Sequence, residues 1–146
     1  MEPKQAPIIP EQIHLLVIKV VQQKIDLQSF KQQKERRLNV GHKLLHNLEK
    51  EGIKLELAFS FEDANNTQLL FFQIDFHFQI EHLNNFYQLN KENQPVFNAL
   101  LIATLLGISV STSRGIIFEK LQNAGISNVI IPVVSPQKML PKPASQ

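Results

Sequence analysis

Apolar and polar residues alternate strictly along two consecutive segments in the middle of the chain. Segment 53–61 has an apolar residue at every odd position, and segment 69–83 has one at every even position from Phe72 to Ile80. A period of two is typical of a β-strand that buries one face and exposes the other. The residues between the two segments, EDANNTQ, have turn composition. The pattern therefore predicts a long antiparallel hairpin that supplies much of the core.

Two further strands are expected before this hairpin. Residues 22–30 are predicted to form the first strand, with Ile25 and Leu27 on one side. Residues 38–48 are predicted to form the second, although an amphipathic helix stays open for the stretch HKLLHNLE. The apolar run at 13–21 has a periodicity that does not separate helix from strand.

The most apolar part of the chain follows Pro95 and predicts a long helix over residues 95–121. Pro95 suits the first helical position, and Gly125 suits the stop after the last turn. Because residues 100–108 are apolar nearly all round, we expect this helix to pack on its own sheet and also against a second copy of the protein. The predicted interface residues are Leu101, Leu105 and Ile108.

The order of these elements predicts an α+β fold, in which a four-stranded antiparallel sheet is followed by a long helix packed on one face. Segment 126–134 then has strand composition limited by Pro132. The domain is expected to span residues 13–135, between a flexible tail at 1–12 and a flexible, proline-rich tail at 136–146. Three prolines are expected to exclude a regular helix from the second tail: Pro136, Pro141 and Pro143.

The charge and the cysteine content limit the partners, the chemistry and the location that are expected for this protein. The 146 residues carry 15 basic and 13 acidic side chains, so neither nucleic acid nor an anionic membrane is an expected partner. The absence of cysteine excludes disulfides and thiol chemistry, and together with the lack of a recognisable secretory signal it favours a cytoplasmic protein. Polar residues such as Asn98 and Arg114 interrupt the apolar stretch at 95–118, so membrane insertion is not expected.

No set of residues points to catalysis, a metal site or a cofactor. His42 and His46 have the spacing of two ligands on one helix face, but Lys43 stands where a metalloprotease helix carries its glutamate. Glu56 and Asp75 lie on the alternating polar face that solvent is expected to cover, instead of converging in a pocket. We therefore expect a protein that is not an enzyme and needs no cofactor.

The chain has more aromatic residues than the buried faces of the predicted strands account for. Phe71, Phe86 and Tyr87 break the alternation, and Phe30 shares the polar side of the predicted first strand. Apolar surface left exposed usually marks an interaction site. These four residues are the predicted polypeptide-binding residues, and a subunit interface is an equally good explanation of them.

These features together resemble a known family. Four antiparallel strands precede a long helix, a Ser-Arg-Gly triplet stands at 113–115 late in that helix, and a Pro-Val step follows at 132–133. The stretch QKIDLQSF at 23–30 adds weaker support. In this order and spacing, from about Val21 to Leu140, the chain resembles the bacterial export chaperone SecB. The resemblance implies a homo-oligomer, a dimer or tetramer, that binds unfolded polypeptides in apolar grooves without ATP.

The chain also departs from that family. Its export members are strongly acidic and carry a second long helix and a tail that contact the translocation motor. Here the charge is slightly basic, and the prolines after Met139 leave no room for such a helix, so contact with the motor is not expected. Clients of an export or a toxin-antitoxin type both fit. The alternatives are an assembly module of the same fold without chaperone activity and, less favoured, a hotdog-type thioesterase, in which the helix precedes the strands.

Three residues of the resemblance are expected to be architectural. Arg114 lies in an apolar helix and needs a partner, such as a carbonyl group or Glu119, because an unpaired buried charge is costly. Gly115 is expected to let a neighbouring element approach the helix backbone closely. Pro132 is expected to shape the segment that follows the helix.

Overall fold

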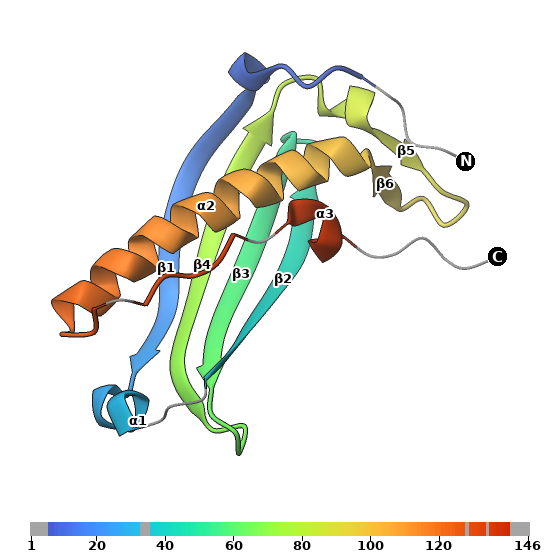
Figure 1. Ribbon diagram of the computed structural model, residues 1–146. Helices are drawn as coiled ribbons and strands as arrows, with labels where there is room; N and C mark the ends of the chain where they lie inside the picture. Colours follow the sequence, from blue (N-terminus) through green and yellow to red (C-terminus); the bar gives the residue numbers. More distant parts are fainter. Residues whose placement is uncertain (1–5, 33–35, 128, 134, 141–146) are drawn as a thin grey trace.

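The computed structural model of the protein describes residues 6–32, 36–127, 129–133 and 135–140. Strands and one long helix make up most of this range (Figure 1). In chain order the elements are η1 (Pro10–Gln12), β1 (Ile13–Ile25), α1 (Leu27–Gln32), β2 (Arg37–Asn47), β3 (Gly52–Glu62), β4 (Gln68–Ile80), η2 (Leu83–Phe86), β5 (Tyr87–Leu89), β6 (Pro95–Phe97), α2 (Ala99–Asn123) and α3 (Pro136–Met139).

The four long strands form one antiparallel sheet in the order β1-β4-β3-β2. The predicted hairpin is confirmed as β3 and β4, and β2 confirms the strand interpretation of 38–48. The first strand was placed wrongly, because β1 begins at Ile13 and ends at Ile25. The undecided run at 13–21 is therefore strand, whereas residues 27–32 are helical. The α+β fold with a four-stranded sheet before the long helix is confirmed.

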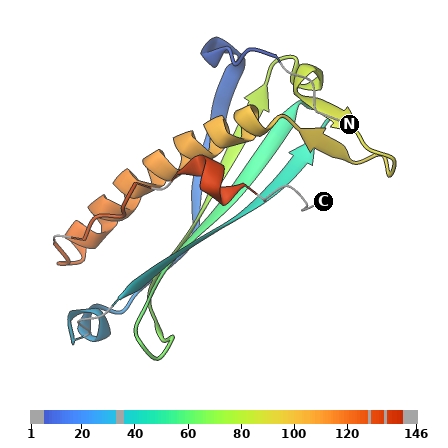
Figure 2. The ribbon, with the colours of Figure 1, turned by 45° about the vertical axis from the view of Figure 1, so that its right-hand side comes forward.

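One face of the sheet is the core. The odd positions of β3 and the even positions of β4 from Phe72 are buried, as the alternation predicts, with Leu55, Phe59 and Ile74 fully covered. Helix α2 lies across this face, and the C-terminal segment returns along the helix on the same side (Figures 1 and 2). Burial of each such side chain stabilises the fold by about 1.5–3 kcal/mol. The opposite face, called the outer face below, has no covering element in the described part of the chain (Figure 2).

Helix α2 begins later than its proline suggested. Pro95 lies in β6, where it pairs with Leu89, so the assignment of Pro95 to the first helical position was wrong. Asn98 is the actual cap, since its side-chain oxygen accepts hydrogen bonds from the backbone N–H groups of Leu100 and Leu101 at 2.8 and 3.2 Å. Gly125, at φ +86°, follows the end of the helix and confirms the predicted stop.

By length and composition α2 could cross a membrane, but half of its most apolar window is buried inside this fold. In this structure it acts as the core helix that covers the sheet. The chain after it packs on the core through Ile126 and Ile131, yet the described residues between them form no strand, contrary to the expectation for 126–134. Pro136 starts the short helix α3, so proline did not exclude helix there.

The folded unit is also longer than the predicted range 13–135. Ala6 and Ile8 lie against the core before it, as do Met139 and Leu140 after it. The described parts of the two predicted tails therefore contribute to the domain.

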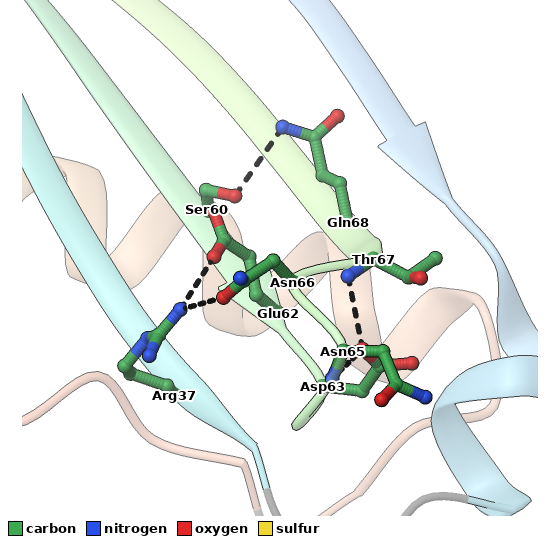
Figure 3. A network of polar contacts seen from close by, with 8 residues as sticks. All are labelled: Arg37, Ser60, Glu62, Asp63, Asn65, Asn66, Thr67 and Gln68. Carbon is green, nitrogen blue, oxygen red and sulfur yellow. Dashed lines mark hydrogen bonds and ion pairs between the residues drawn. The ribbon is translucent and has the colours of Figure 1, made fainter.

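The turn between β3 and β4 is held by side chains (Figure 3). The buried carboxylate of Asp63 accepts hydrogen bonds from the backbone N–H groups of Asn65 and Thr67, both at 2.9 Å. Arg37 on β2 donates to Glu62 at 2.9 Å and to Asn66. An aspartate that caps its own turn fixes the chain reversal. The turn therefore fixes the register that brings the alternating faces of β3 and β4 together.

Candidate functional site

Two of the four predicted polypeptide-binding residues belong to the core. Phe30 is only 2% exposed and packs edge-on against Phe61, with the ring centroids 6.2 Å apart. Phe86 in η2 is 4% exposed. Their assignment to a binding surface is corrected, because strand parity was applied to residues that lie in helical turns. Phe71 and Tyr87 are half-buried.

Tyr87 belongs to a small apolar patch on the β5–β6 hairpin. We call it the hairpin patch and define it as Tyr87, Leu89, Val96 and Phe97. Leu89 and Val96 are exposed by 46% and 41%, and the rings of Tyr87 and Phe97 pack edge-on at 5.8 Å. Phe97 also contacts the ring of His46 on β2, which fixes the hairpin beside that strand. A hollow of about 220 Å³ lies on this hairpin, lined in part by Leu89 and Val96.

A second apolar surface lies on the opposite edge of the sheet. Strand β1 pairs with β4 on one side alone, and large apolar side chains are exposed along it. We call these residues the edge-strand surface: Leu15, Leu16, Val17, Ile18 and Val21. The register slips near Leu16 and near Val21, which sends apolar side chains to both faces of the strand. A long apolar edge strand is a site for association with another chain.

The outward face of α2 carries no charge over about five turns. Its residues share the spacing of one helix face and are small or apolar: Leu100, Thr104, Ile108, Ser111, Gly115 and Phe118. Among the predicted interface residues, Ile108 lies on this face. Leu101 and Leu105 are fully buried by the rest of their own chain, so their assignment to an interface is corrected. Because residues on every side of this helix are apolar, the sequence alone did not show which side of it packs on the sheet.

The three architectural residues are placed as follows. Nε of Arg114 donates a hydrogen bond to the carbonyl oxygen of Ile131 at 2.8 Å, so the carbonyl partner is confirmed. This contact ties the C-terminal segment to α2. Gly115 has open space where a Cβ would stand, so nothing in the described chain approaches it closely, and that prediction was wrong. Pro132 is exposed and directly follows the carbonyl that Arg114 holds.

Titratable groups do not converge on a reactive centre in the described chain. No group of three or more His, Cys, Asp or Glu residues among the described residues could hold a metal ion. The hydrogen bond to Glu56 raises the pKa of Lys54, and the nearby charge of Asp75 adds to this effect. The backbone and side-chain hydrogen bonds of Ser29 lower the pKa of Asp26 at the start of α1. Both groups are structural ion-pair or capping residues.

Comparison with solved structures identifies the fold. The SecB-like chaperone of Mycobacterium tuberculosis, solved in complex with a ChAD peptide from the HigA1 antitoxin, is similar to this chain with a TM-score of 0.52. The similarity covers 86% of this chain and 92% of that one, at 8% sequence identity. The protein has a SecB-like fold. Neither a model of a protein family nor a curated protein sequence matches the chain.

With this SecB-like fold, the sequence resemblance is confirmed at the level of architecture. In this chain the strands precede the long helix, which is the reverse of the order that the hotdog alternative requires. At 8% identity the similarity concerns the fold, and residue roles must come from the surfaces described above.

Proposed function

We propose that this protein is a SecB-like chaperone, which binds unfolded or non-native polypeptides in the cytoplasm without ATP or another cofactor. The observation that carries the proposal is the amount of large apolar side chain left exposed on a SecB-like fold, on the hairpin patch and on the edge-strand surface. Exposed apolar surface of this kind is a binding surface for other chains. The solved relative holds a peptide, which supports the same class of partner here.

The hairpin patch is the proposed client contact. It lies beside β2, whereas the edge-strand surface lies along β1 at the other edge of the sheet (Figure 1). Association through one surface therefore leaves the other accessible. Tyr87 and Phe97 present aromatic rings, and Leu89 and Val96 add aliphatic surface, a combination suited to apolar side chains of varied shape.

The edge-strand surface and the outward face of α2 are the proposed subunit contacts of a homo-oligomer, a dimer or a tetramer. A second β1 can pair with the open edge of the first, so that the apolar side chains of the two strands lie side by side on each face of the joined sheet. The space beside Gly115 and the small Ser111 allow a helix of another subunit to approach α2 closely. This would give Gly115 the role that no element of its own chain fills.

Suppression of aggregation tests the proposal. The purified protein, mixed with a chemically denatured, aggregation-prone protein at a stoichiometric ratio and without nucleotide, is expected to reduce light scattering as the denaturant is diluted. Absence of protection at any ratio up to a severalfold excess would remove the chaperone proposal. An oligomer that fails to protect would instead favour the second candidate, an assembly module whose apolar surfaces serve subunit contacts alone.

A further inference from the structure

The outer face of the sheet holds a hollow of about 590 Å³. It lies on the side of the sheet away from α2, near the turn between β2 and β3. All four strands contribute to its lining, which includes Leu16, Leu45, Gly52, Lys54, His77 and Gln79. It therefore differs in place from the hairpin patch and from the outward face of α2, and it shares Leu16 with the edge-strand surface.

The hollow forms at a position of the sheet where the residue has no side chain. Gly52 contributes no side chain to its floor, while Leu16 on β1 and Leu45 on β2 stand exposed on either side, by 61% and 37%. In the strand register Lys54 and His77 stand between the two leucines, and Gly52 lies one row further along the sheet, so the room for a large apolar side chain from another molecule is above Gly52. Asp75 on this same face is only 5% exposed, because the longer side chains of Lys54 and Gln73 lie against its carboxylate.

The charged side chains that line the hollow are basic. Lys50 and Lys54 line it together with His46 and His77, and none of the lining residues in the described chain is acidic. Lys54 already contacts Glu56 at 3.2 Å and Asp75 at 3.5 Å. The exposed Lys50 has no acidic partner within ion-pair distance among the described residues. An incoming carboxylate can therefore bind near Lys50 without displacing an existing ion pair.

We propose that this outer-face hollow binds an acidic peptide segment that inserts one large apolar side chain above Gly52, in the hollow that Leu16 and Leu45 help to line. Charge complementarity selects the carboxylates of such a segment, and the apolar walls select its anchor residue. Single-stranded nucleic acid is the less favoured anion, since bases need aromatic stacking platforms and no Phe or Tyr other than Phe78, which is buried, lines the hollow. The proposal stands independently of client binding, because it does not use the hairpin patch, which is the proposed client contact.

Fluorescence anisotropy with labelled 12-residue peptides tests this. One peptide combines leucine with glutamate, a second has lysine in place of glutamate, and a third has serine in place of leucine. The protein is expected to bind the first peptide at least about tenfold more tightly than the other two at low ionic strength. Salt at about 0.5 M should weaken this binding, because it screens exposed charges. Equal binding of the lysine peptide, or tighter binding of a labelled oligonucleotide, would overturn the proposal.

Three variants locate the binding. Gly52→Val fills the floor of the hollow, where a Cβ meets only ordinary contacts at 3.8–4.0 Å, and Lys50→Glu reverses an exposed charge. Each should weaken binding of the acidic peptide at least about fivefold, whereas Lys120→Glu on α2 should change it less than about twofold. If Gly52→Val has a lower melting temperature than the parent, the test rests on Lys50→Glu, which changes an exposed residue. Unchanged binding of the acidic peptide by Lys50→Glu would overturn the proposal. Lys50→Glu should suppress aggregation as well as the parent does. Failure of the chaperone proposal and failure of the peptide-binding proposal can therefore be told apart.

Discussion

Ser113 is the buried side chain whose polar atom lacks a hydrogen-bond partner among the described residues. Its neighbour on the same helix, Ser109, is equally buried but donates to the carbonyl oxygen of Leu105 at 2.8 Å. A buried hydroxyl without a partner costs about 1–3 kcal/mol. The two serines are equally buried on one helix and differ in whether the hydroxyl has a hydrogen-bond partner.

Ser113→Ala is expected to raise the free energy of unfolding by roughly 1 kcal/mol, because it removes an unsatisfied hydroxyl. Ser109→Ala should stabilise less or destabilise, since it removes a satisfied one, and the gain in helix propensity is common to both. Urea denaturation followed by circular dichroism measures the difference. A Ser113→Ala variant that is less stable than Ser109→Ala would mean that Ser113 has a partner.

Asp26 makes stability depend on acid pH. Its pKa is lowered from 3.8 by the hydrogen bonds from Ser29 at the start of α1, so the folded state favours the charged carboxylate. Its contribution is present above the unfolded-state pKa and is lost as the pH falls through the lower folded-state pKa. Asp26→Asn removes this titration. Denaturation curves between about pH 2 and 6 should show the stability of the parent falling toward that of the variant as the pH drops. A constant difference over that range would contradict this.

At the scale of elements, the strands of the hairpin were predictable because apolar and polar residues alternate along each of them with a period of two. The start of α2 was not, since Pro95 fits a first helical position in sequence but pairs with Leu89 in β6, and Asn98 provides the cap. The fate of Phe30 was missed for a related reason. Asp26 directly follows the end of β1 and caps α1, so the parity of a strand no longer applied at Phe30.

The two sides of α2 predict opposite results for substitution with lysine. Ile108→Lys on the outward face should leave the monomer folded and reduce the mass of the oligomer in light scattering, because it places a charge in the proposed subunit contact. Leu105→Lys should unfold the chain, since that side chain is fully covered by its own chain. If Ile108→Lys keeps both the mass and the melting temperature of the parent, α2 is not a subunit contact.

At the scale of the whole molecule, the sequence predicted the architecture better than the surfaces. Element order and alternation led to the SecB-like fold, which the structural similarity supports over most of both chains. The exposed surfaces depend on how the elements pack. Apolarity on every side of α2 hid the side that faces the sheet, and no signal in the run at 13–21 said that it would be an edge strand.

The central claim is that exposed apolar surface on this fold binds non-native polypeptide through the hairpin patch. Size-exclusion chromatography with light scattering, run with a permanently unfolded protein, measures this complex directly. The parent should form a stable complex, Leu89→Asp combined with Val96→Asp should lose it, and Val133→Asp should keep it although Val133 is 82% exposed. A parent that elutes separately from the unfolded protein at every ratio would contradict the claim.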